Sequence, residues 1–121
     1  MKAIITLAGK TLRVHLSRAA ARALARRDAP LVVEMELYFS CLIRKTVRFR
    51  DTTRHGAAVR VTDRLLVEFR PVTSARCGLS GDEPALRDFP IADPRAYVPR
   101  WLTIDYRRGE WRGQFGYHRL D

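Results

Sequence analysis

The sequence predicts an α+β fold: a mixed, mainly antiparallel set of β-strands with one main helix and one short helix. Two patterns support this prediction. Short segments in which apolar and polar residues alternate are separated by glycine, proline and aspartate, which is typical of half-buried strands joined by turns. One segment rich in alanine and arginine instead repeats its apolar residues at helical spacing. With 121 residues, of which 46% are hydrophobic, we expect a single domain, residues 1–121, around one core.

The first elements are predicted to be a β-hairpin. Residues 2–7 and 11–16 have strand patterns, and Gly9-Lys10 lies between them as a turn. In the second strand, alternate apolar residues share one face: Leu12, Val14 and Leu16.

The main helix is predicted over Arg18 to Arg27. Ser17 stands at the N-cap position, where a hydroxyl accepts a hydrogen bond from the first helical turn. Arg22 and Arg26 point away from the apolar face, and Pro30 stops the helix because proline disfavours helical geometry in the residue before it. The apolar face consists of small and branched residues: Ala20, Ala23 and Leu24.

Two strands are predicted next, Leu31 to Phe39 and Leu42 to Arg50. The first alternates an apolar face with a face that carries Glu34 and Glu36. The second sets Val47 and Phe49 inward and two arginines outward. We expect the two glutamates to face arginines of the neighbouring strand as cross-strand pairs that mark the register.

The remaining pattern alternates strands and loops. Short strands are predicted around 58–61 and 65–70, and the Gly- and Pro-rich segment 71–86 is predicted to be a loop. Asp93-Pro94 opens a short helix that runs to Val98. A final hairpin joins residues 102–106 to 111–117, with one shared face: Trp111, Gly113, Phe115 and Tyr117.

The order of several segments is informative as a set. They are Val14-His-Leu-Ser-Arg-Ala-Ala-Ala21, Leu31 to Cys41, Leu42 to Phe49, Phe89 to Pro94, Ala96 to Val98, Ile104-Asp-Tyr106 and Gly113-Gln-Phe115. This order resembles the HesB/IscA family, the A-type carriers of iron-sulfur cluster assembly. The resemblance implies a single HesB-like domain in which residues 1–13 are an N-terminal strand extension and residues 52–86 an insertion.

The resemblance also implies a metal site. Cys41 occupies the position of the family's first cysteine ligand, while the family's terminal Cys-Gly-Cys has no counterpart, so the implied ligand set is reduced. Cys77 and His118 are the candidates to complete a site for iron or an iron-sulfur cluster, in one chain or shared across a homodimer. The implied partner is an iron-sulfur assembly or acceptor protein. The alternative is that Cys41 is a buried small hydrophobe, Cys77 an ordinary loop residue and His118 solvated.

The net charge of +10 is concentrated in residues 1–80, which hold 16 Lys and Arg against 6 Asp and Glu. A basic surface of this size attracts an acidic protein or a phosphate backbone such as RNA. The alternative is a solvated arginine face, since 20 of the 23 basic residues are arginine, as a GC-rich genome produces. The candidate partner-binding residues lie in one stretch: Arg44, Lys45, Arg48, Arg50 and Arg54.

Two functions are therefore expected from the sequence. The first is a divergent carrier-like or accessory protein of iron-sulfur assembly, and the alternative is a metal-free basic module that binds an acidic protein or RNA. No catalytic triad order, phosphate-binding glycine loop or His-Glu-x-x-His pattern appears, so we do not expect an enzyme. No RNP, KH or helix-turn-helix signature appears either. Because no apolar run has the length of a signal peptide or membrane span, we expect a cytoplasmic protein.

Overall fold

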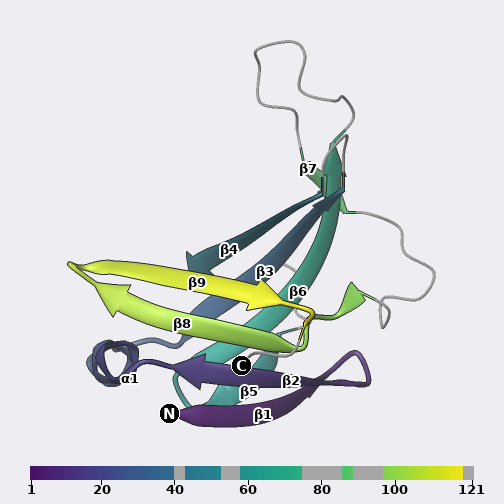
Figure 1. Cartoon of the computed structure of the whole chain (residues 1–121). Helices are drawn as coiled ribbons and strands as arrows, with labels where there is room; N and C mark the ends of the chain where they lie inside the picture. The colour runs from purple at the N-terminus through teal and green to yellow at the C-terminus, as the bar shows by residue number, and fades with distance from the viewer. Residues whose placement is uncertain (40–42, 53–57, 75–85, 89–96, 119–121) are drawn as a thin grey trace.

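The computed structural model describes residues 1–39, 43–52, 58–74, 86–88 and 97–118. In these residues the chain forms two mixed β-sheets and a single α-helix, as Figure 1 shows. Each sheet contains one parallel strand pair among antiparallel pairs. The predicted mixture of mainly antiparallel strands with one main helix is therefore confirmed.

The first sheet joins the two ends of the chain, in the strand order β1-β2-β8-β9, and β2 and β8 run parallel. Both predicted hairpins are confirmed, although the first turn was predicted one residue too late, at Gly9-Lys10, and Lys10 is the first residue of β2. Each turns through two residues with positive φ, Ala8-Gly9 and Arg108-Gly109, a geometry that follows the twist of the paired strands. The four strands are β1 (Lys2–Leu7), β2 (Lys10–Leu16), β8 (Trp101–Arg107) and β9 (Glu110–Gly116).

The second sheet comes from the middle of the chain, in the order β4-β3-β6-β5, with β7 also pairing with β6. The parallel strands β3 and β6 lie at its centre. Residues 52–86, the implied insertion, supply β5 and β6, so this segment is an integral part of the sheet. The strands are β3 (Leu31–Phe39), β4 (Arg44–Arg50), β5 (Val59–Thr62), β6 (Leu65–Ser74) and β7 (Leu86–Asp88).

The predicted loop at 71–86 is wrong at both ends, because β6 continues to Ser74 and β7 begins at Leu86. Proline is tolerated in a strand where one edge has no neighbour. Pro71 meets this condition: β5 pairs with β6 only as far as Val67, and β7 begins to pair at Val72. The apolar pattern of β6 therefore overrides the proline signal.

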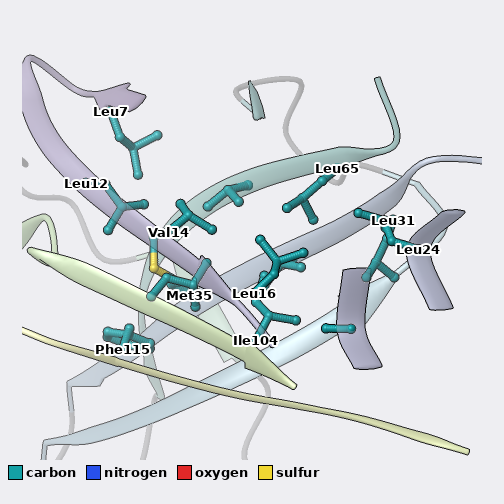
Figure 2. Packing of buried hydrophobic residues seen from close by; sticks show 14 of the residues in the cluster. Leu7, Leu12, Val14, Leu16, Leu24, Leu31, Met35, Leu65, Ile104 and Phe115 are labelled. Atoms are coloured by element: carbon teal, nitrogen blue, oxygen red, sulfur yellow. The ribbon is translucent and has the colours of Figure 1, made fainter. Parts of the chain in front are cut away.

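The two sheets enclose the hydrophobic core and approach each other at both edges, where β4 lies along β9 and β1 along β5. Figure 2 shows side chains from both sheets and from the helix converging on this space. Fifteen buried residues form the cluster: Leu7, Leu12, Val14, Leu16, Ala20, Leu24, Leu31, Val33, Met35, Leu65, Val67, Val98, Leu102, Ile104 and Phe115.

The helix α1 (Arg18–Ala25) follows β2 and packs against the end of β8. Its N-cap is confirmed: the Ser17 hydroxyl accepts a hydrogen bond from the backbone N–H of Ala20 at 3.1 Å. The helix ends at Ala25, two residues before the predicted Arg27, and Arg26 is its C-cap. The predicted apolar face is buried as expected: Ala20, Ala23 and Leu24.

One predicted face differs from expectation. In β3 the residues that alternate with the core face were expected to form an outward acidic face, but Glu34 and Glu36 are 0% and 2% exposed. β3 lies between β4 and β6, and arginines of β4 reach across to pair with both glutamates, which buries this face as well. The predicted short helix at Asp93 to Val98 lies largely outside the described residues.

Candidate functional site

The predicted metal ligands are only partly within the described structure. Cys41 and Cys77 lie outside the described residues. His118 follows β9 and is exposed, and its carbonyl accepts a hydrogen bond from the Trp101 Nε1–H at 2.6 Å. Within the described ranges, no three His, Cys, Asp or Glu side chains lie close enough together to hold a metal ion. The iron site therefore stays a prediction, because two of its three candidate ligands lie outside the described residues.

The predicted basic stretch divides into two kinds of residue. Arg44 and Lys45, at the start of β4, are exposed, and neither has an ion-pair partner in the described part of the chain. Arg48 and Arg50 are ion-paired with glutamates of β3, and Arg54 lies outside the described residues.

The two ion pairs lie diagonally across neighbouring strands. The Arg48 Nε is 3.0 Å from Oε2 of Glu36, and the Arg50 Nε is 3.5 Å from Oε2 of Glu34. The predicted glutamate–arginine pairing between these strands is confirmed. Because both glutamates are almost completely buried, each arginine compensates a charge that has lost its water. Arg48 and Arg50 therefore have a structural role.

A different group of arginines is unpaired. Arg18 and Arg22 of α1 and its C-cap Arg26 follow each other at intervals of four residues, and all three are exposed. Residues four apart lie on the same helix face, and the backbone rises by about 6 Å per interval. None of the three has a hydrogen-bond or ion-pair partner among the side chains of the described residues. We call this row the arginine stripe.

The remaining arginine of this region shows the contrast. Arg27 forms an ion pair with Asp51 at the end of β4, and its Nε donates to the Ala29 carbonyl at 3.2 Å. It therefore holds the chain after the helix against the second sheet. The arginine stripe has no comparable structural contact.

A hydrogen-bond network fixes the start of the stripe to the first sheet. The Ser17 hydroxyl donates to Oδ1 of Asp105 in β8 at 2.6 Å, and the Arg107 Nε lies 2.8 Å from Oδ2 of the same carboxylate. The hydrogen bond from Ser17, followed by the backbone N–H of Tyr106, lowers the pKa of the Asp105 carboxyl from its ordinary value of 3.8. This network holds the helix N-terminus beside the β8–β9 turn, where Arg108 is also exposed.

The sequence analysis did not single out the arginine stripe as a binding surface. The sequence did contain an indication of this surface, since Arg22 and Arg26 were predicted to point away from the core. The sequence could not show which arginines form ion pairs, because the acidic partners of Arg27, Arg48 and Arg50 come from other elements.

Comparisons with known proteins returned no match: no family model matches the chain, and neither the curated proteins nor the solved structures contain a significant relative. In the described residues, no helix has the length and apolar character needed to cross a membrane.

Proposed function

We propose that this chain is a metal-free interaction module that binds an acidic segment of a partner protein through the arginine stripe of α1. The observation that carries the proposal is the row of three exposed guanidinium groups, Arg18, Arg22 and Arg26, without an ion-pair partner in the described structure. Guanidinium groups bind carboxylates through paired, charge-assisted hydrogen bonds. A row of them on one helix face suits an extended run of aspartate and glutamate.

The aromatic side chains favour an acidic protein over RNA as the partner. Proteins that bind single-stranded nucleic acid combine basic charge with exposed aromatic rings on which bases stack. Here the Trp111 ring lies against two other rings, with its centroid 6.0 Å from that of Phe49 and 4.7 Å from that of Tyr106, and all three rings pack against the core. All three rings are half-buried, so they leave little free ring face on which bases could stack.

The proposal is tested by the binding of a fluorescent oligoglutamate peptide, followed by anisotropy at several salt concentrations. We expect affinity to fall as salt rises, because exposed charges are screened. The variant R18Q/R22Q/R26Q should weaken binding by about tenfold or more. The matched control R13Q/R60Q/R100Q removes the same charge from exposed arginines elsewhere and should retain most of the affinity.

If both triple variants lose the same affinity for the peptide, net charge alone explains the binding and the proposal is contradicted. An oligouridylate of the same charge provides the other comparison. If it binds more tightly than the peptide, and does so through the arginine stripe, the partner is a nucleic acid and the acidic-protein proposal is wrong.

The carrier function that follows from the HesB/IscA resemblance is a separate proposal, together with its HesB-like fold and cytoplasmic location. It rests on the ordered segments and on Cys41 alone. Anaerobic reconstitution with iron and sulfide tests it: a thiolate-to-iron absorption band in the wild type that is absent in Cys41→Ser supports the carrier function. If the band is absent from both the wild type and Cys41→Ser, the carrier function is contradicted.

A further inference from the structure

A cavity of about 350 Å³ lies between the edge strands of the two sheets. It is bounded by β4 on one side and by β8 and β9 on the other, and its volume is within the range of small-molecule sites. Six residues line it: Lys45, Val47, Trp101, Gly113, Gln114 and Phe115. We propose that this cavity binds a small planar aromatic anion.

The cavity is shaped by two glycines of β9. A Cβ atom at Gly113 would lie 2.7 Å from Cγ1 of Val47, so glycine is needed for β9 to approach β4 this closely. A Cβ atom at Gly116 would collide with the indole ring of Trp101. The absence of a side chain at these two positions thus lets the strands and the indole pack as the walls of the cavity.

Trp101 is held in place before any ligand binds. Its ring packs over Gly116, and its Nε1–H donates to the carbonyl of His118 at 2.6 Å. An aromatic wall that is already fixed loses little conformational freedom on binding, which favours affinity. Phe115 also borders the cavity, but its side chain is 2% exposed and belongs to the core, so the Trp101 indole is the aromatic wall.

The polar groups of the lining define the charge of the ligand. Among the described residues that line the cavity, Lys45 carries the only charge, and its side chain is exposed without a partner. The Gln114 side chain adds an amide that both donates and accepts hydrogen bonds. Aromatic and aliphatic walls with a single free ammonium group complement a flat apolar ring that bears one carboxylate.

The proposal goes beyond the acidic partner of the arginine stripe, because the cavity and α1 use different residues.

Naphthoate serves as the probe, and naphthalene methanol, which has the same ring and no charge, as its control. Binding is followed by NMR through the two indole N–H signals, which Trp111→Phe assigns. We expect naphthoate to shift the Trp101 signal and to bind at least about tenfold more tightly than the alcohol.

Two lysine variants test the origin of the affinity. Lys45→Glu should weaken naphthoate binding by about tenfold or more, whereas Lys10→Glu, an equal charge change at the exposed start of β2, should leave it within about twofold. The proposal is overturned if naphthoate does not shift the Trp101 signal, if the alcohol binds equally well, or if the two lysine variants behave alike.

Discussion

The arginines of β4 and those of α1 have the same side chain and opposite roles. Arg48 and Arg50 lie across from buried glutamates, so their charges stabilise the second sheet. Arg18 and Arg22 project from the helix without an ion pair in the described residues. The comparison shows that a basic residue is informative about binding only once its acidic neighbours in space are known.

The largest expected effect comes from breaking a structural pair. Arg50→Ala leaves the fully buried carboxylate of Glu34 without its cation, which should lower the free energy of unfolding by about 3 kcal/mol. Urea denaturation followed by circular dichroism measures this loss. Arg44→Ala, an exposed arginine of the same strand, is the matched control and should change the free energy of unfolding by less than about 0.5 kcal/mol.

A double variant sharpens this result. Glu34→Leu/Arg50→Met removes both members of the pair, so Glu34 no longer leaves a buried charge without its cation, and the double variant should be more stable than Arg50→Ala by about 2 kcal/mol. A double variant as unstable as Arg50→Ala would mean that packing of the arginine stem, and not the charge of Glu34, sets the loss.

The network at the helix N-terminus should have an intermediate effect. Ser17→Ala removes the cap and the hydrogen bond to Asp105, and should cost about 1 kcal/mol in denaturation experiments. The same network makes stability depend on pH.

Because the pKa of Asp105 is lowered in the folded state, its contribution is complete above pH 3.8 and is lost as the pH falls through the lowered value. The thermal midpoint of the wild type should therefore approach that of Asp105→Asn below this pH. A constant difference between the two midpoints across the acidic range would contradict this account of Asp105.

The smallest effect is expected within the arginine stripe. Arg22 has an arginine four residues away on each side, and such like-charge neighbours on a helix are unfavourable by about 0.2 to 0.5 kcal/mol per pair. Arg22→Gln should therefore leave stability unchanged or raise it slightly in the thermal midpoint. A clear loss would show that Arg22 has a structural partner and would remove the contrast with β4.

The elements that local pattern determines were predicted well from the sequence. The two hairpins, the Ser17 cap and the inward face of Val47 and Phe49 depend on alternation, turn residues and capping, all of which are local. The continuation of β6 through Pro71 was missed because the neighbours of a strand are set by distant segments. The burial of Glu34 was missed for the same reason, since parity along β3 cannot show that both of its faces are covered.

The candidate sites depend even more on distant contacts. The arginine stripe stands out only after Arg48 and Arg50 are seen to be paired with β3. The cavity requires β4 to lie beside β9, and these strands are remote in sequence. The sequence contained Lys45 and Trp101 but gave no reason to place them on the same cavity.

The most direct test of the contrast between the two arginine groups is the affinity of oligoglutamate for Arg22→Gln and for Arg50→Gln, measured side by side at low salt and at a temperature where both variants are folded. The two substitutions remove the same charge. The proposed roles predict that Arg22→Gln binds the peptide clearly more weakly than Arg50→Gln, which should bind like the wild type. Equal affinities, or a greater loss in Arg50→Gln, would contradict the assignment of binding to the arginine stripe.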